Sequence, residues 1–293
     1  MSTSIPAPAR PVPATPGASR PPRLRGIARL RAFRSDIRDR LERARALERL
    51  PPERFGFSVG QATRLFMVTC ALYRHYFRTQ CFGLETQPTG AAMLVANHAS
   101  HALAWDGANI VSAGLLDADP PRLIHGMGEH RLMDLPIIGA HARGIGAVDG
   151  RPPECISLLR AGAVVLTFPE GTRAHGRSYR DRYQLAPFGH GFARIALTTG
   201  VPIVPVAAIG AEEEAPLLAN PRWLQRLMKV PCAPVTATLV VPLPVRYRLH
   251  FGRPIWLTGS LEPRNVAHGV EQVRRVLGEM IVEGLASRRR VFV

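Results

Sequence analysis

Three short, almost wholly apolar runs constrain the fold of this chain more than any other feature. They occupy residues 91–96, 164–168 and 203–209, and glycine, proline or polar residues bound each of them. Runs of this length are typical of strands that are buried on both faces. Segments with a helical repeat of apolar residues, such as 106–116 and 188–199, separate them. This alternation predicts an α/β domain with a mixed, mostly parallel sheet that is flanked by helices.

The other elements of the domain follow from the same two periods. Further strands are expected at 123–127, 144–148 and 247–251, and further helices at 131–140, 153–161 and 265–287. Pro136 is expected to interrupt its helix. Pro202 and Pro205 indicate that the strand at 203–209 lies at an edge of the sheet or carries a bulge, because proline has no N–H to donate to a central ladder.

Two segments precede the main domain, which is expected to span residues 84–293. Residues 1–22 are rich in proline, alanine, serine and arginine, and we expect a disordered tail. Residues 23–83 are expected to form amphipathic, interfacial helices, since apolar residues recur every three or four positions over 24–50 with arginines on the other faces. Such a helix either lies on an anionic membrane surface or packs on the domain with its charges in solvent.

The net charge of the chain limits the classes of partner that it can bind. The net charge is +16 at pH 7, and arginine supplies nearly all of it. This balance suits phosphate-bearing lipids, coenzyme phosphates or nucleic acid, but the arginines do not fall into a recognisable nucleic-acid module, so we expect no nucleic acid. The four cysteines are scattered, and no cysteine–histidine cluster has metal-ligand spacing, so we expect no metal. No apolar run reaches the roughly 18 residues of a membrane-spanning helix.

The first apolar run leads directly into a histidine and a carboxylate. Asn97 and His98 end the run, and Asp106 stands eight residues after the histidine. A carboxylate that holds one ring nitrogen of a histidine leaves the other nitrogen to take a proton from a hydroxyl. Because ligands of such sheets bind at the carboxyl ends of the strands, His98 and Asp106 are candidates for a general base and its partner.

The second apolar run ends in a tight turn with opposite charges. Glu170, Gly171, Thr172 and Arg173 follow Pro169. The glycine permits a ligand to approach the backbone closely, and the arginine can bind a phosphate through two N–H groups. Glu170 either holds Arg173 or bonds a substrate hydroxyl. The alternative is a surface turn with an exposed ion pair, which contributes little.

Two further stretches carry arginines between and after these motifs. Residues 144–148 lead into a turn that contains Arg151, which either contacts a second phosphate or is a solvated loop charge. Residues 176–183 form a basic segment with two tyrosines that either binds anions or lies in solvent.

In this order the motifs resemble the four sequence blocks of the glycerolipid acyltransferases, the superfamily of lysophosphatidate acyltransferases with its diacylglycerol acyltransferase-like branches. The blocks are Asn97-His98 with a later aspartate, the glycine-rich stretch before Arg151, Phe168–Arg173, and Val201–Val206. The resemblance covers about residues 70–255. It implies transfer of a fatty acyl group from a coenzyme A or carrier-protein thioester to a glycerolipid hydroxyl of the lysophosphatidate type, in phospholipid biosynthesis.

The resemblance also implies roles for individual residues. His98 would be the base and Asp106 its partner, and the turn Glu170, Gly171, Thr172 and Arg173 would bind the acceptor, with Arg151 as a further contact. No cofactor, metal or covalent acyl-enzyme is implied. The partners would be the lipid acceptor, the acyl thioester and an anionic membrane surface, which places the protein at the cytoplasmic face of a membrane as a peripheral or monotopic protein.

The spacing of the first block departs from the family pattern. The common spacing places the aspartate five residues after the histidine, where this chain has Leu103. Either the loop is three residues longer and His98 remains the base, or His101 and Asp106 form the dyad. We prefer His98, since it directly follows the strand. A longer loop with Trp105 before the aspartate looks like a divergent bacterial branch of the superfamily. Arg151 also stands one residue late for its block.

Two alternatives to a lysophosphatidate-type enzyme stay open. One is a neutral-lipid acyltransferase that acts on diacylglycerol or an alcohol. The other is a catalytically silent membrane homologue that binds lipid, which the stretched spacing between His98 and Asp106 motivates.

Overall fold

The structure is a computed structural model that describes residues 26–49, 56–99, 104–128, 130–134, 136–174, 179–219, 221, 223, 226, 235–236 and 241–292. The predicted tail at 1–22 and His101 lie outside the described residues.

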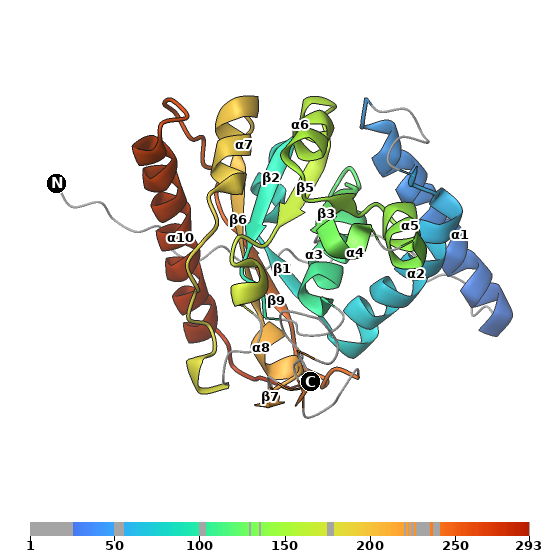
Figure 1. Cartoon of the computed structure of the whole chain (residues 1–293). Coiled ribbons are helices and arrows are strands. Elements are labelled where there is room, and N and C mark those ends of the chain that lie inside the picture. Colours follow the sequence, from blue (N-terminus) through green and yellow to red (C-terminus); the bar gives the residue numbers. More distant parts are fainter. Residues whose placement is uncertain are drawn as a thin grey trace.

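A seven-stranded sheet forms the centre of the protein (Figure 1), with the strand order β1-β9-β6-β2-β5-β3-β4. The strands are β1 Gln80–Phe82, β2 Ala92–Ala96, β3 Ile124–Gly128, β4 Val148–Asp149, β5 Val164–Thr167, β6 Ile203–Ile209 and β9 Arg248–Phe251. All neighbouring pairs are parallel except β6 and β9. The prediction of a mixed, mostly parallel sheet is therefore confirmed. A separate two-stranded antiparallel sheet pairs β7 Leu217–Ala219 with β8 Val235–Thr236.

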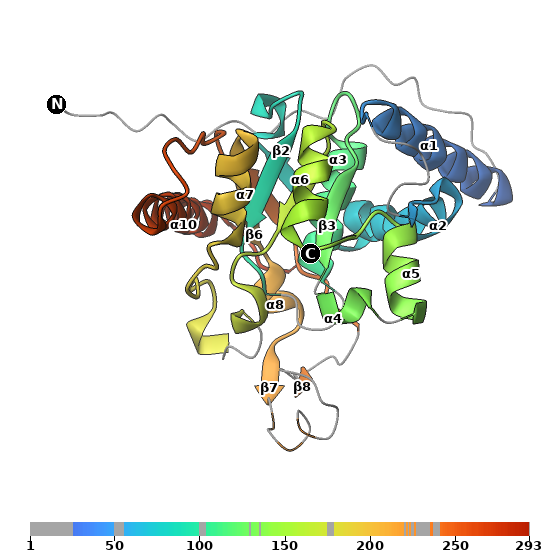
Figure 2. The same cartoon turned by 45° about the horizontal axis from the view of Figure 1, so that its top comes forward.

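Helices cover both faces of the sheet (Figure 2). The α-helices are α1 Gly26–Ala46, α2 Val59–Ala71, α3 Trp105–Leu116, α4 His130–Met133, α5 Pro136–Gly144, α6 Pro152–Arg160, α7 Gly191–Thr199, α8 Ala211–Glu214 and α10 Pro263–Ala286. Along β2, Ala92, Leu94 and Ala96 pack toward α1, α2 and α3, whereas Met93 and Val95 pack toward α6, α7 and α10. Because successive strand residues face opposite sides, β2 is buried throughout.

The central strands bring their carboxyl ends to one edge of the sheet. Leu94 of β2 lies opposite Leu166 of β5 and Val204 of β6, and all three strands run in the same direction. The segments that follow β2, β5 and β6 in the sequence therefore begin side by side at this edge.

Two expectations about elements were wrong. The strand β6 is central, between β9 and β2, although it contains Pro205. The N–H of Ile203 donates to the carbonyl of Ile255, on the side of β6 that faces β9. The nitrogen of Pro205, two residues later, points to the same side. The pairing with β9 ends at Phe251, opposite Val206, so no ladder bond needs an N–H at Pro205. The helix expected at 131–140 is interrupted before Pro136, as predicted: α4 ends at Met133, and Pro136 begins α5 because the first helical turn needs no N–H donor there.

The strand expected at 144–148 is shorter and begins later than predicted. The helix α5 continues to Gly144, and β4 comprises Val148 and Asp149 alone.

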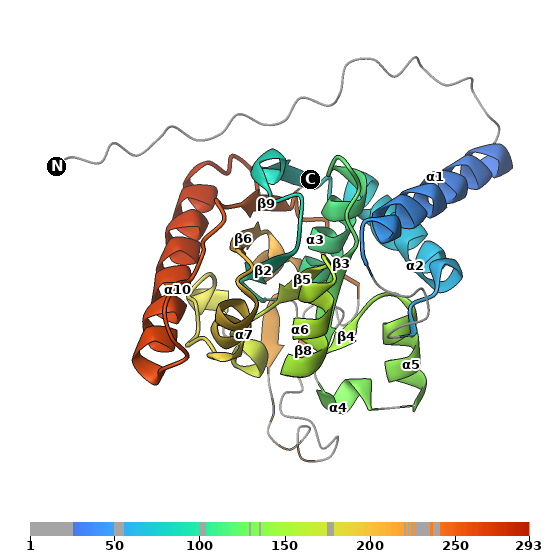
Figure 3. The same cartoon turned by 90° about the horizontal axis from the view of Figure 1, so that it is seen from above.

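The N-terminal helix α1 packs on the domain over part of its length and leaves its first turns exposed. In α1, Ile37, Leu41 and Ala44 are buried against the domain. Its first turns instead project past the neighbouring helices (Figure 3), and the side chains of Ile27 and Leu30 are 72% and 58% exposed. Within the described parts of the chain, no helix is both long and apolar enough to cross a membrane.

Candidate active site

Asn97 fixes the end of β2 to the neighbouring strand. Its side-chain Nδ2 donates to the carbonyl of Ala208 at 3.2 Å, and its Oδ1 accepts from the amide of Ala208 at 2.8 Å. The side-chain amide thus continues the pairing of β2 with β6 after the main chain of β2 has turned away. This contact sets where the next residue, His98, leaves the sheet.

His98 and Asp106 are in direct contact in a buried position. The ring Nδ1 of His98 lies 2.7 Å from Oδ2 of Asp106. Asp106 is fully buried in the first turn of α3, where a negative charge is favoured by the helix dipole. Its Oδ2 also accepts from the amide of Ala99 at 3.1 Å, and its Oδ1 accepts from the amide of Gly107 at 2.7 Å. The eight-residue spacing is therefore compatible with a His–Asp dyad.

The charge of each partner shifts the pKa of the other. Burial lowers the pKa of His98, but the negative charges of Asp106, Glu170 and Glu212 together raise it by more than burial lowers it, so the net shift is upward. Burial raises the pKa of Asp106, but His98 and the amides of Ala99 and Gly107 lower it more, so Asp106 stays ionised. An ionised carboxylate at Nδ1 favours the tautomer that has its proton there, and Nε2 then carries the lone pair.

The ring of His98 is also held on one face. Phe168, the residue after β5, stacks on it with ring centroids 4.3 Å apart and an angle of 27° between the planes. His98 is 9% exposed. Its orientation is therefore set by a carboxylate at one edge and an aromatic ring on one face.

The carboxylate of Glu170 bonds two main-chain amides next to this site. It is fully buried, its Oε1 accepts from the amide of His98 at 3.1 Å, and its Oε2 accepts from the amide of Ala186 at 2.7 Å. The carboxylate thereby connects the end of β2 with the segment before α7. The structure thus places Glu170, the predicted acid of this turn, in contact with the backbone of His98, the predicted base.

Gly171 and Arg173, which continue the turn, are exposed. Gly171 has φ 55°, and a Cβ there would meet no atom within 4 Å, so the glycine serves the left-handed backbone conformation. Thr172 lies in the 3-10 helix Gly171–Arg173. Arg173 is exposed and donates through Nε to the carbonyl of Pro187 at 3.0 Å, which ties the turn to the segment before α7.

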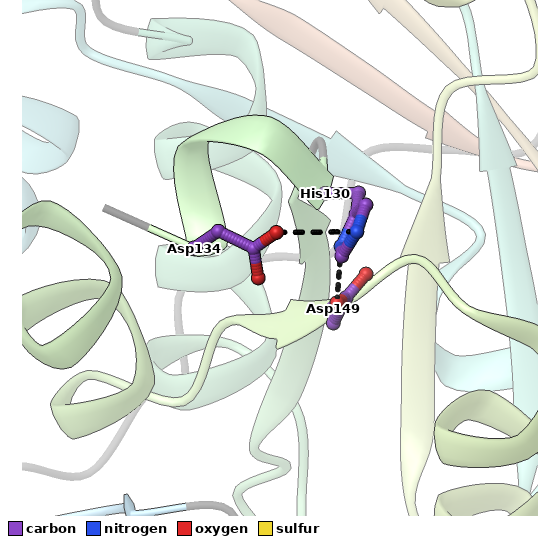
Figure 4. A group of neighbouring side chains, drawn as sticks. All are labelled: His130, Asp134 and Asp149. Atoms are coloured by element: carbon purple, nitrogen blue, oxygen red, sulfur yellow. Dashed lines mark hydrogen bonds and ion pairs between the residues drawn. The ribbon is translucent and has the colours of Figure 1, made fainter. Parts of the chain in front are cut away.

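A second cluster at the same edge, after β3 and β4, comprises His130, Asp134 and Asp149 (Figure 4), and Arg151 contacts it. Asp149 accepts from Nδ1 of His130 at 2.8 Å and from Nε of Arg151 at 3.1 Å. The Nε2 of His130 lies 3.2 Å from Asp134. Arg151 is half exposed, whereas Asp149 is buried.

This cluster has the donor atoms of a metal site but carries its own cation. His130, Asp134 and Asp149 each offer an atom within 4.8 Å of the others. One imidazole and two carboxylates suit a divalent ion. The guanidinium of Arg151 lies 3.1 Å from Asp149 and within hydrogen-bonding distance of both ring nitrogens of His130, so it offsets one of the two carboxylate charges and occupies the side from which a metal would bind the imidazole. The donor set therefore fits a metal poorly.

A buried acidic segment that follows β6 at the same edge of the sheet was not predicted from the sequence. The three residues Glu212, Glu213 and Glu214 form most of α8, directly after β6, and they are 8%, 1% and 0% exposed. Three acids in a row usually indicate a solvated turn. Their position after a buried strand and a glycine was the one available signal, since that is where ligand-facing residues of such sheets occur.

Comparisons with known proteins identify relatives of the domain that carries these residues. Residues 78–209 match the sequence profile of the Acyltransferase family. An uncharacterized protein of Mycobacterium leprae is 34% identical over 235 residues, which is 75% of this chain and 64% of that protein. The chain thus spans slightly less than two thirds of the length of this relative. A chloroplastic 1-acyl-sn-glycerol-3-phosphate acyltransferase of Brassica napus is 31% identical over 154 residues, 48% of this chain and 40% of that protein.

A solved structure shares the fold. The crystal structure of a 1-acyl-sn-glycerophosphate acyltransferase from Thermotoga maritima superimposes with a TM-score of 0.52, covering 90% of this chain and 99% of that one. The sequence identity is 19%, so the likeness concerns the fold.

Proposed function

The domain at residues 78–209 belongs to the glycerolipid acyltransferase superfamily, and on this premise we propose that the protein transfers a fatty acyl group from a thioester to a lipid hydroxyl. The observation that carries the proposal is the buried dyad of His98 and Asp106 at the carboxyl edge of the sheet, with 2.7 Å between Nδ1 and Oδ2. An oriented imidazole of this kind is suited to take a proton from an alcohol.

The proposed mechanism is direct attack. Nε2 of His98 takes the proton of the acceptor hydroxyl as its oxygen bonds to the thioester carbonyl carbon. The tetrahedral intermediate then collapses, the C–S bond breaks, and the leaving sulfur takes the proton back from the imidazolium. Asp106 stabilises the imidazolium and remains ionised throughout. The thioester is a co-substrate on coenzyme A or a carrier protein, and the reaction requires no further cofactor.

Asn97 and Glu170 support this step without touching substrate. Asn97 fixes the end of β2 to Ala208, and Glu170 holds the amide of His98. Both contacts act on the backbone that carries the base. Precise placement of a base contributes strongly to catalysis, because misplacement by about 1 Å costs around a hundredfold in rate.

We favour an acceptor of the lysophosphatidate type. The relative from Brassica napus bears that activity in its name, and Arg151 and Arg173 follow β4 and β5 at the edge that holds His98. Guanidinium groups are well suited to a phosphate headgroup. A neutral lipid hydroxyl is the second candidate, since Arg151 already pairs with Asp149 and Arg173 already donates to Pro187.

We further propose that the protein works as a peripheral protein on an anionic membrane surface, which would be the cytoplasmic face. The proposed acceptor is a membrane lipid. The exposed apolar residues of α1, Ile27 and Leu30, stand among the exposed arginines Arg29, Arg31 and Arg34. This combination is typical of helices that bind anionic lipid.

The decisive experiment is product identification. The full-length protein is incubated with an acyl-coenzyme A or an acyl-carrier protein and, separately, with lysophosphatidate, another lysophospholipid, diacylglycerol and a long-chain alcohol. We expect phosphatidate by mass spectrometry, and none from His98→Ala. A triacylglycerol or wax ester product would instead establish the neutral-lipid alternative. Lipid binding without any product would overturn the enzymatic proposal in favour of a silent homologue.

A further inference from the structure

The residue directly after β5 lies against the ring of His98. The rings of Phe168 and His98 have their centroids 4.3 Å apart, with an angle of 27° between their planes. The two rings are therefore stacked nearly face to face. The imidazole lies over the face of the phenyl ring and not at its edge.

The backbone that carries Phe168 is fixed on both sides of this residue. Thr167, the last residue of β5, is paired with β2. The carbonyl of Phe168 accepts from the amide of Gly171 at 3.0 Å, and the carbonyl of Pro169 accepts from the amide of Gly189 at 2.8 Å. The sheet and the following turn together determine where the phenyl ring starts.

The far end of the phenyl ring lies against the first turn of α3. Gly107 follows Asp106 in this turn, and a Cβ at Gly107 would lie 3.6 Å from Cε2 and Cζ of Phe168. This is an ordinary contact distance. Phe168 therefore contacts both His98 and the helix that supplies the carboxylate partner of His98.

A phenyl ring in this position distinguishes the two protonation states of His98. The face of an aromatic ring carries negative charge density, so it attracts a cation that lies within about 6 Å of the ring centroid. The imidazole of His98 is within this range. An imidazolium gains more from the contact than a neutral imidazole does, so the stacking favours the protonated form.

We propose that Phe168 is a positioning residue of the acyl-transfer site, whose π face stabilises the imidazolium that His98 becomes when it takes the acceptor proton. The proposal rests on the proposed function. A contact that is stronger in the transition state than in the ground state raises kcat. The stacking of Phe168 on His98 meets this condition, because the positive charge on the imidazole forms during the attack.

The charged groups around His98 stay the same when Phe168 is changed. Asp106 of α3 bonds the ring of His98, Glu170 after β5 bonds its amide, and the charge of Glu212 in α8 contributes to its raised pKa. A replacement at Phe168 adds no charge and removes none. A displaced titration of His98 therefore reports on the phenyl ring.

The test is a titration of His98 in the full-length protein, in which NMR chemical shifts of its ring C–H groups are followed against pH. Phe168→Leu keeps an apolar side chain but has no π face. Loss of a cation–π contact at a buried imidazole is expected to move the midpoint down by about one pH unit. The acid limb of kcat/KM should move down by the same amount, and kcat above it should fall at most about tenfold.

A second variant separates the π face from packing. Replacement of Phe168 by meta-fluorophenylalanine keeps the shape of the ring but withdraws electron density from its face. The fluorine can occupy Cε1, because the ring meets Gly107 at Cε2 and Cζ. We expect a midpoint between those of the wild type and Phe168→Leu. This variant also provides the test should Phe168→Leu not fold.

Phe192→Leu is the matched control. Phe192 lies in α7, in the core on the other face of the sheet, where its ring packs edge-on against Phe188. The same loss of an aromatic ring should lower the melting temperature there and leave the midpoint of His98 unchanged.

An identical His98 midpoint in the wild type and in Phe168→Leu would overturn the inference. So would an equal displacement in Phe192→Leu, or a wild-type midpoint in the fluorinated protein, because packing and not the π face would then govern the titration. The titration needs no turnover. A wild-type protein without acyl transfer would therefore refute the proposed function separately from the contact between Phe168 and His98.

Discussion

At the scale of single residues, the strongest prediction concerns His98. Its ring is held by Asp106 and Phe168 and its amide by Glu170. We expect His98→Ala to lower kcat by at least about 10²- to 10⁴-fold, the usual contribution of a general base, while circular dichroism stays unchanged. His268→Ala, at an exposed position of α10, serves as the control and should keep full activity. Full activity in His98→Ala would exclude it as the base.

Because the pKa of His98 is raised, we expect kcat/KM to fall on the acid side of its pH profile at an unusually high pH. The base acts in its neutral form, and Asp106, Glu170 and Glu212 favour the protonated form. Activity should therefore be present above the raised pKa and fall as the pH decreases through it, with a midpoint above the ordinary value of about 6.5. A profile of kcat/KM against pH measures this midpoint. A rate that stays constant down to pH 5.5 would contradict the role of the carboxylates.

The dyad could be inferred from the sequence because its signal is local. His98 follows an apolar run, and Asp106 starts the next helical pattern eight residues later. The contact of Glu170 with the amide of His98 spans 72 positions, and its bond to Ala186 depends on the path of the segment before α7. The bond from the amide of Tyr183 to Glu212 spans 29 positions and has no counterpart in the spacing of the sequence.

At the scale of elements, α1 carries a prediction about membrane binding. Its first turns expose Ile27 and Leu30 together with Arg29, Arg31 and Arg34. Each arginine near an anionic surface contributes about 1 kcal/mol to binding. Changing the three arginines to glutamine should therefore weaken partitioning into phosphatidylserine-containing liposomes by about a hundredfold. Sedimentation with liposomes gives the measurement.

The matched control for α1 changes exposed arginines on the opposite helical layer. Arg264 and Arg275 of α10 are exposed and lie on the other face of the sheet. Their replacement by glutamine should leave binding nearly unchanged. An equal loss in both variants would mean that net charge, and not α1, governs the attraction to the membrane.

Strands with a clear apolar pattern in the sequence could be predicted. The position of a strand in the sheet, which depends on its neighbours, could not. The residues of β2 and β6 are apolar throughout, so their strands stand out in the sequence. The central place of β6 was not predictable, because Pro205 is tolerated only where the ladder with β9 stops. The short strand β1 emerges at the end of the segment predicted as helical, and its pairing with β9 joins residues about 170 positions apart.

At the scale of the whole molecule, the sheet class followed from the alternation of elements, whereas the strand order did not. Strands β2 and β5 are neighbours although α3, β3 and β4 intervene in the sequence. That order gathers one candidate residue from each strand end: His98 after β2, the turn with Arg173 after β5 and Arg151 after β4. The edge therefore has a buried acidic region around the base and exposed arginines farther along.

This separation of charge makes the last prediction one about the acceptor headgroup. Arg151 is half exposed, bonded to Asp149 and follows β4 at the edge that holds His98, and we propose it as a contact for the acceptor phosphate. If the acceptor is lysophosphatidate, Arg151→Ala should raise its KM at least about tenfold, since a hydrogen bond to a charged group contributes about 1.5–3 kcal/mol, and should leave kcat nearly unchanged. Arg160→Ala, at the exposed opposite end of α6, is the control. Kinetics with lysophosphatidate and with diacylglycerol provide the measurement, because the change should affect the anionic acceptor alone. An unchanged KM for lysophosphatidate would show that Arg151 does not bind the headgroup and would favour a neutral acceptor.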